Sequence, residues 1–282
     1  MTRHTFTADV AATRPYLLDN AAPQAPARFR ALAELYDAGT IRHLEGCGVA
    51  SGWRCLEVGG GGGSIARWLA DRVSPGGRVL ATDVDTRYLN ALCDPRIEVR
   101  HHDILEPLPE GPFDLIHARL VLNALADRDA VLHRMVGALA PGGWLLLEEF
   151  DSDSAAPDPG LDSGETYLET HRALARFMSD KGFDRRYGRR LFRQFRDCGL
   201  SEVAAEARMF MCTGGSAGAA LIRANLEQLR DALIDGGYVT ESQFAEDIAA
   251  LDRPDFMMPS SILWSVCGRR APRRVMGSNS GR

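Results

Sequence analysis

Five consecutive glycines, Gly59 to Gly63, follow the apolar stretch Cys55-Leu-Glu-Val58 and precede a run that predicts a helix. Glycine lets the chain turn sharply and lets a ligand approach the backbone closely. Asp83 ends the next apolar run, 20 residues after Gly63 (83 − 63). A carboxylate at this place accepts hydrogen bonds from a ribose in nucleotide-binding βαβ units. Written as Gly61-x-Gly63-x-x-Ala66, the run also fits the dinucleotide fingerprint, so the glycines alone leave two cofactor classes open.

Glu57 separates the two cofactor classes. It lies two residues before Gly59, inside the apolar stretch, and a buried carboxylate is costly unless it has a partner. We expect it either to order the N–H groups of the loop or to face a cation. A sulfonium that carries an α-amino group is cationic, whereas the pyrophosphate of a dinucleotide is an anion that Glu57 would repel. Glu57 therefore favours a cationic ligand over a pyrophosphate.

Other residues could take part in a reaction. The stretch Glu148-Glu149-Phe150-Asp151 closes an apolar run, and one of its carboxylates could orient a substrate or take up a proton. We select Glu149, together with His171 on a predicted helix, as the candidate catalytic residues. His117, inside a predicted strand, fits the core better than catalysis. His101 and His102 have no further ligand at a recognisable spacing, so we predict no metal site.

From residue 53 on, short apolar runs alternate with amphipathic ones, and these runs predict the strands and helices that position the candidate residues. Such alternation predicts βαβ units and an α/β fold: a Rossmann-like, mostly parallel seven-stranded sheet with helices on both faces. The expected strands are Trp53–Val58, Arg78–Asp83, Ile97–His101, Phe113–Ala118, Trp144–Phe150, Ser201–Cys212 and Ser261–Cys267, and the expected helices between the first five are Ser64–Val73, Thr86–Cys93 and Asp127–Leu139.

The predicted domain organisation adds helices to this sheet. Residues 1–50 are expected to form an N-terminal helical cap. The main domain spans 51–268, with helical insertions at about 155–198 and 214–256. Residues 269–282 are expected to be a disordered basic tail.

Several motifs stand in a characteristic order along the sheet. They are Glu57-Val-Gly-Gly-Gly-Gly-Gly63, Ala81-Thr-Asp-Val-Asp85, His102-Asp-Ile104, Phe113-Asp-Leu-Ile-His-Ala118 and Leu139-Ala-Pro-Gly-Gly-Trp-Leu-Leu-Leu-Glu148. Together they resemble the class I S-adenosylmethionine-dependent methyltransferases of small-molecule type, similar to the quinone-biosynthesis methyltransferases. The resemblance covers roughly residues 50–150. One departure is Val121-Leu-Asn-Ala-Leu125, where many relatives carry a histidine, so that loop supplies no histidine base.

The resemblance implies a role for particular residues of this chain. The glycines of the loop would line the amino-acid end of the cofactor, with Gly60 and Gly62 incidental. Asp83 would hold the ribose hydroxyls, with Asp85 as its rival. The implied cofactor-binding set is Glu57, Gly59, Gly61, Gly63, Asp83, Val84 (against the adenine), Asp103 and Ile104 (on the adenine amino group and ring), and Arg119 near the methionyl part.

Composition bounds the partners. The chain has 282 residues, a net charge of −5 and no apolar run as long as a membrane span. We therefore expect a soluble, cytoplasmic protein with no nucleic-acid or membrane partner, and the sequence leaves open whether it forms a homo-oligomer. The expected reaction is in-line methyl transfer to a small, secondary-metabolite-like acceptor, in which positioning alone could suffice. The alternatives are an NAD(P)-dependent oxidoreductase and a cofactor-bound scaffold or cyclase that does not methylate.

Overall fold

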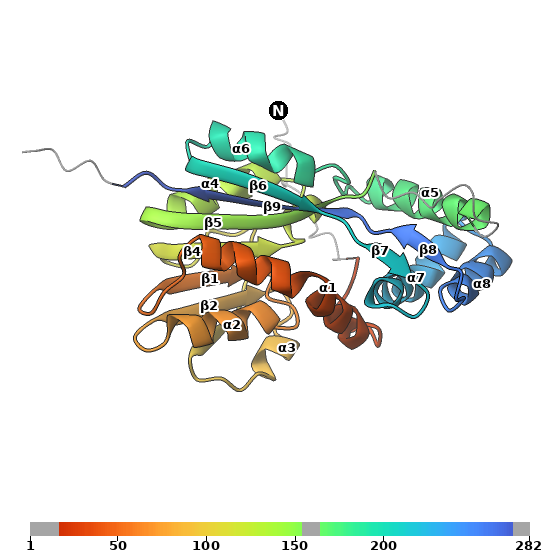
Figure 1. Ribbon diagram of the computed structural model, residues 1–282, viewed down its shortest axis with the longest axis horizontal. Coiled ribbons are helices and arrows are strands. Elements are labelled where there is room, and N and C mark those ends of the chain that lie inside the picture. Colours follow the sequence, from red (N-terminus) through yellow and green to blue (C-terminus); the bar gives the residue numbers. More distant parts are fainter. Residues whose placement is uncertain (1–16, 154–163, 273–282) are drawn as a thin grey trace, which may run out of the picture.

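The computed structural model describes residues 17–153 and 164–272, which are built around a seven-stranded β-sheet (Figure 1). The strand order is β3 (Ile97–His101), β2 (Arg78–Asp83), β1 (Arg54–Val58), β4 (Phe113–Arg119), β5 (Leu139–Asp151), β9 (Ile262–Arg269) and β6 (Ser201–Arg208). Strands β1 to β5 are parallel, and β9 lies antiparallel between β5 and β6. The predicted mostly parallel, seven-stranded α/β sheet is confirmed.

The strand order reverses between β1 and β4. From β1 the chain moves outward to β2 and β3, and then returns to place β4 and β5 on the other side of β1. In open parallel sheets a ligand binds at the carboxyl ends of the strands on either side of such a switch point. The five glycines follow β1, and Arg119 ends β4, so both lie at this edge.

Helices cover both faces of the sheet because buried parallel strands carry apolar side chains on both sides. One face holds α1 (Ala25–Gly46), α2 (Ser64–Val73) and the short α3 (Arg87–Asn90), whereas α4 (Arg128–Ala138) and α6 (Leu191–Asp197) cover the other (Figure 1). Successive side chains of a strand point to opposite faces. Leu115 thus belongs to the core under α1 and α2, and Ile116 to the core under α4 and α6.

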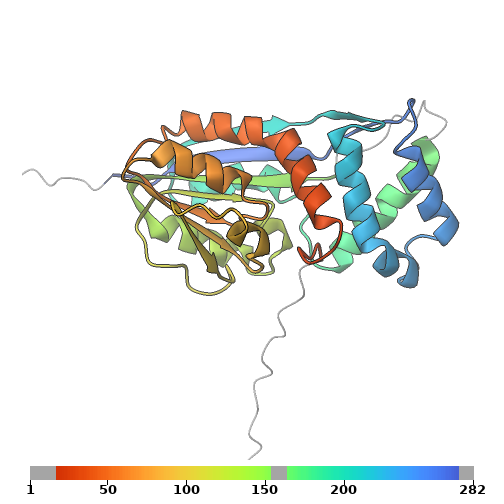
Figure 2. The same ribbon diagram turned by 90° about the horizontal axis from the view of Figure 1, so that it is seen from below.

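A second group of helices lies beyond the carboxyl end of β5. It consists of α5 (Gly164–Asp180), α7 (Ala217–Asp235) and α8 (Glu241–Ala250), next to the small sheet of β7 (Met211–Thr213) and β8 (Met257–Pro259). Figure 2 shows these helices at the same end of the molecule as the first turns of α1. Phe177, Leu229 and Phe244 contribute one side chain each from α5, α7 and α8 to a separate apolar core.

The helix expected at Thr86–Cys93 is shorter, Arg87–Asn90, and three strand boundaries also differ from expectation. The strand expected at Ser201–Cys212 is two strands, since β6 ends at Arg208 and β7 pairs with β8 instead. Strand β5 begins at Leu139 and not at Trp144, because Leu139 pairs with Phe113 of β4 and the backbone of Gly142 and Gly143 pairs with Arg270. For the same reason β9 continues to Arg269, beyond the expected domain end at 268. Residues 1–16 and 273–282 of the expected cap and tail lie outside the described residues.

Candidate cofactor and active site

The glycine loop, residues 59–63, has a backbone that demands glycine at alternate positions. Gly59, Gly61 and Gly63 have φ angles of 64°, 49° and 79°. These are left-handed conformations, which glycine adopts without steric cost. The Gly61 N–H donates to Asp83 Oδ2 at 2.9 Å, so the end of β2 holds the loop in place.

Side chains from two helices pack on the same loop: Phe29 of α1, and Leu89 of α3, whose Cδ2 would lie 3.0 Å from a Cβ at Gly60. A Cβ at Gly61 would lie 2.7 Å from Cε1 of Phe29 in α1, and a Cβ at Gly62 would lie 2.9 Å from Cβ of Phe29. Phe29 also packs edge-on against Tyr88 of α3, with ring centroids 5.2 Å apart. Phe29 thus occupies the space that a side chain at Gly62 would need, whereas the expectation that Gly60 and Gly62 are incidental to cofactor binding stays a prediction.

The two candidate ribose acids differ in their surroundings. Asp83, the last residue of β2, is 8% exposed and accepts from the N–H groups of Gly61 and of Asp85, the latter at 3.0 Å. Burial raises the pKa of Asp83, and the backbone donors oppose that rise. Asp85 is more exposed, and the side chain of Arg87 binds it at 2.8 Å. Which of the two meets a ribose stays a prediction.

The expected adenine residues lie at the ends of β2 and β3. The His102 N–H donates to the Asp83 carbonyl oxygen at 3.0 Å, which brings the two strand ends together. Asp103 follows β3 and caps a tight turn through the Leu105 N–H at 2.9 Å, while the Ile104 side chain is buried. Val84, directly after β2, is 47% exposed.

Glu57 has a partner that the sequence interpretation missed. Its side chain is buried, and Oε2 lies 2.7 Å from Nδ1 of His117 on the neighbouring strand β4. The group that faces Glu57 in the protein is thus an imidazole. Our inference from Glu57 to a cationic cofactor needs correction, since the carboxylate is already paired without one. The sequence did contain a signal for this pair, because each of two adjacent apolar strands carries one ionisable residue.

Arg119 is bound to α1. Its Nη1 donates to Thr40 Oγ1 at 3.0 Å, and its Nη2 donates to Asp37 Oδ1 at 2.9 Å. Both partners lie on the helix that carries Phe29. The guanidinium therefore fastens α1 to the carboxyl end of β4, and the expected contact of Arg119 with the methionyl part stays a prediction.

Glu149 points to the opposite face of the sheet from Glu148 and is fully buried. Its Oε1 accepts from the N–H groups of Val121 and Leu122, at 3.0 and 2.6 Å, in the loop that follows β4. Burial raises the pKa of Glu149 to about 8, although these donors oppose the rise. Glu149 therefore holds this loop, and its predicted catalytic role is untested.

His171 lies on α5, in the helical group beyond β5. Burial and the positive charge of Arg185 lower its pKa, while a hydrogen bond to the backbone of Ser152 opposes that change. Ser152 directly follows β5, so the imidazole lies near the carboxyl edge of the sheet. A neutral imidazole there could accept a proton, as predicted for this residue.

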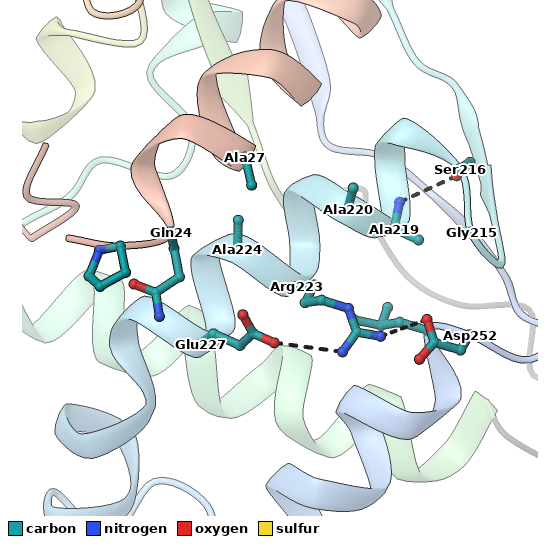
Figure 3. A pocket seen from close by; sticks show the side chains of 12 residues that line it. Gln24, Ala27, Gly215, Ser216, Ala219, Ala220, Arg223, Ala224, Glu227 and Asp252 are labelled. Carbon is teal, nitrogen blue, oxygen red and sulfur yellow. Dashed lines mark hydrogen bonds and ion pairs between the residues drawn. The ribbon is translucent and has the colours of Figure 1, made fainter. Parts of the chain in front are cut away.

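A hollow of about 490 Å³ lies elsewhere, between the start of α1 and α7 (Figure 3). Alanines line much of it, and none of its lining residues belongs to the glycine loop. Its one arginine, Arg223, is 2.8 Å from Asp252 and 3.6 Å from Glu227, so its charge is already paired. Arg223 therefore offers the hollow no unpaired charge.

Within residues 17–153 and 164–272, no cluster of three or more His, Cys, Asp or Glu side chains is placed to bind a metal ion. The helices of these ranges also include none with the length and apolar character needed to span a membrane.

Comparison with known proteins identifies the centre of the fold. Residues 56–145 match the family model described as a methyltransferase domain. This span runs from β1 into β5 and includes the glycine loop, Asp83, Asp103 and Arg119.

Curated relatives cover part of the chain. Methyltransferase str2 of Strobilurus tenacellus is 37% identical over 140 residues, 49% of this chain and 50% of that protein. Methyltransferase str3 of the same organism is 35% identical, over 44% of this chain and 48% of that protein. A ubiquinone/menaquinone biosynthesis C-methyltransferase of Hahella chejuensis is 28% identical, over 38% and 47% respectively. This chain thus spans about half the length of the curated relatives it matches.

Solved structures share the fold at low identity. The YcgJ protein of Bacillus subtilis superposes with a TM-score of 0.55 and 12% identity, covering 84% of this chain and 99% of that one. Phosphoethanolamine N-methyltransferase 2 of Haemonchus contortus, in complex with S-adenosyl-L-methionine, gives 0.54 and 15%, covering 88% and 57%. The sheet, the motifs and the matched span together confirm the expected resemblance: residues 56–145 form a methyltransferase domain of the class I, S-adenosylmethionine-dependent family.

Proposed function

We propose that this chain transfers the methyl group of S-adenosylmethionine to a small-molecule, secondary-metabolite-like acceptor by in-line displacement. The observation that carries the proposal is the position of the glycine loop. It lies inside the matched methyltransferase span and at the carboxyl edge of the sheet, next to the switch point between β1 and β4. S-adenosylmethionine is the cofactor of this family.

The proposed cofactor position runs along the ends of three strands. The amino-acid part would lie at the glycine loop, the ribose at Asp83 or Asp85, and the adenine between Val84 and the turn at Asp103. The exposure of Val84 supports this order, because an adenine ring would cover an apolar side chain that solvent otherwise reaches.

The chemistry asks the protein chiefly to align an acceptor atom with the methyl group and to keep water away. For an acceptor that must lose a proton, His171 and Glu149 are the proposed bases. His171 is the better candidate near neutral pH, because its lowered pKa favours the neutral imidazole, which can accept a proton. Glu149, with its pKa near 8, is protonated over much of that range.

The proposed acceptor class rests on the aromatic side chains near the carboxyl edge of the sheet. An apolar cluster of Tyr36 from α1, Phe150 at the end of β5 and Phe210 before β7 lies there, with the rings of Phe150 and Phe210 each within 6 Å of Tyr36. Aromatic side chains of this kind bind planar apolar molecules well. The name of the Hahella chejuensis relative, which refers to quinone biosynthesis, supports an acceptor with a ring.

Isothermal titration calorimetry with S-adenosylmethionine, S-adenosylhomocysteine and NADH tests the cofactor. We expect the first two to bind and NADH not to bind; a preference for NADH would favour the oxidoreductase alternative. A panel of phenols, quinols and other ring acceptors, followed by mass spectrometry for a gain of one methyl group, then tests the reaction. Binding without methylation of any acceptor class, including amines and polyketide-like chains, would favour the scaffold or cyclase.

A further inference from the structure

Three ionisable side chains form a row across the α1 side of the sheet. Glu57 on β1, His117 on β4 and Glu148 on β5 are at most 4% exposed. Glu57 is paired directly with His117 in the strand register, and Arg119, two residues on, is paired with Glu148. Buried parallel strands normally carry apolar residues here, so the row needs a physical reason.

The imidazole of His117 lies between the two carboxylates. Its Nδ1 is 2.7 Å from Glu57 Oε2, and its Nε2 is 3.5 Å from Glu148 Oε2, an ion-pair distance without hydrogen-bond geometry. Only the protonated imidazolium carries an N–H on both nitrogens. Burial alone would lower the pKa of His117, but the charges of Glu57 and Glu148 outweigh it and raise that pKa to about 9.

The groups around Glu148 support a charged His117. Glu148 accepts from the Arg208 guanidinium of β6 at 2.9 Å, and also from Ser265 and Thr40. Arg208 reaches this place by passing Gly39 of α1, where a Cβ would overlap its guanidinium. His43 of α1 also faces Glu148, and burial lowers the pKa of His43, which favours its neutral form.

Charge balance gives the same result, since Glu206, 4.0 Å from Arg208, is itself paired with Arg42 and leaves the balance of the other groups unchanged. Glu57, Glu148 and Asp37 contribute three negative charges, while Arg119 and Arg208 contribute two positive ones. A protonated His117 supplies the third positive charge. Without it a buried carboxylate would lack a partner, which is strongly unfavourable.

The network meets the glycine loop from two sides. The Cγ of Glu57 is 3.6 Å from the place of a Cβ on Gly60, so Glu57 lies directly under the loop. On the other side, Thr40 and Asp37 anchor α1 to Glu148 and Arg119. The same helix places Phe29 on Gly61 and Gly62.

We propose that His117 is a cationic positioning residue: its charge joins Glu57 under the glycine loop to the Glu148–Thr40 anchor of α1 and thereby holds the loop ready for the cofactor. His117 touches no cofactor itself. The inference rests on the proposed function for the identity of the cofactor, but the ordering of the loop does not depend on it.

The protonation state can be measured in the unaltered, ligand-free protein. With ¹⁵N-labelled imidazoles, NMR should show both nitrogens of His117 protonated at pH 7.5, with the proton lost only near pH 9. Exposed His133 on α4 serves as the internal control for the assignment of the imidazole signals. A neutral His117 at pH 7.5 would overturn the proposal.

The positioning role is tested with His117→Gln and His117→Lys, with His133→Gln as the control. Hydrogen exchange of the loop amides, measured without ligand under conditions where each variant is folded, should be faster in His117→Gln and near normal in His117→Lys. S-adenosylhomocysteine should bind His117→Gln about tenfold more weakly, as expected for the loss of one charged hydrogen bond. Unchanged loop exchange in His117→Gln would refute the inference. Changed exchange in a protein that never binds S-adenosylhomocysteine would refute the proposed function alone.

Discussion

Replacing Glu149 by Gln should change how the stability of the protein depends on pH. Burial raises the pKa of Glu149 from 4.5 to about 8, so the folded protein keeps a proton that the unfolded chain loses. The stability linked to this group is greatest below pH 4.5, falls as the pH rises, and levels off above pH 8. A shift of 3.5 units at 1.36 kcal/mol per unit corresponds to a total loss of about 5 kcal/mol.

Glutamine has the shape of the protonated acid and cannot ionise. Its carbonyl oxygen can still accept from the N–H groups of Val121 and Leu122, so the loop after β4 keeps its anchor. We expect the variant and the wild type to differ by no more than about 1 kcal/mol at pH 5. At pH 8.5 the variant should be the more stable by about 4 to 5 kcal/mol, because only the wild type holds a buried carboxylate.

Urea denaturation at intervals between pH 5 and 9 measures the difference. Glu110→Gln, at an exposed glutamate, is the matched control and should run parallel to the wild type. Parallel curves for Glu149→Gln and the wild type would refute the reasoning. The same variant tests catalysis: a loss of kcat on the order of 10²- to 10⁴-fold, with unchanged cofactor affinity, would identify Glu149 as a base. An unchanged kcat would leave it the task of holding the loop.

Other variants test other parts of the structure. Asp83→Ala should weaken S-adenosylhomocysteine binding by about 1–3 kcal/mol in calorimetry, and an unchanged affinity would transfer the ribose role to Asp85. Gly39→Ala should lower the melting temperature, since a Cβ there overlaps the guanidinium from β6, whereas Gly137→Ala on α4, where nothing is close, should raise stability by about 0.5–1 kcal/mol. In Glu149→Gln, the unfolding free energy should still fall by about 3 kcal/mol between pH 6.5 and 9, because His117 loses the proton that its raised pKa retains. A flat profile over this pH range would contradict an imidazolium between two carboxylates.

Much of the central sheet could be predicted from the sequence because its signals are local. Strands β2 and β3 and helix α2 have the predicted bounds, since each is a short apolar or amphipathic run ended by glycine, proline or aspartate. The split of the strand expected at Ser201–Cys212 was not predictable in this way. Residues on both sides of the break favour strands, and only pairing with β8, more than 40 positions away, decides it.

The position of the site could be predicted from the sequence, but the side chains that pair with its residues could not. A glycine loop after the first strand indicates where a cofactor binds, whatever the neighbouring strands contain. The partner of Glu57 depends instead on register, because His117 is 60 residues away in sequence and directly opposite in the sheet. A carboxylate within an apolar run indicates that it has a partner, but it does not indicate whether that partner is a ligand or a residue of another strand.

Glu148 and Glu149 show how far the fold separates two neighbours. Successive strand residues point to opposite faces, so Glu148 meets the charged network under α1 while Glu149 meets the loop before α4. Burial would raise the pKa of both side chains. His117 and Arg119 lower the pKa of Glu148 to about 2, whereas the pKa of Glu149, which faces only backbone N–H groups and the more distant Arg128, rises to about 8.

Two carboxyl groups with pKa values so far apart often mark an acid and a base in catalysis. Here both are fully buried, and each holds one boundary of the cofactor edge: Glu148 through His117 and Glu57 the glycine loop, and Glu149 the loop after β4. The two loops that would enclose the transferred methyl group are thus fixed by the same strand, one by a charged and one by a neutral carboxyl group. Raising the pH toward 9 should loosen the glycine loop, because His117 then loses its charge, whereas an ionised Glu149 still accepts from the N–H groups of Val121 and Leu122.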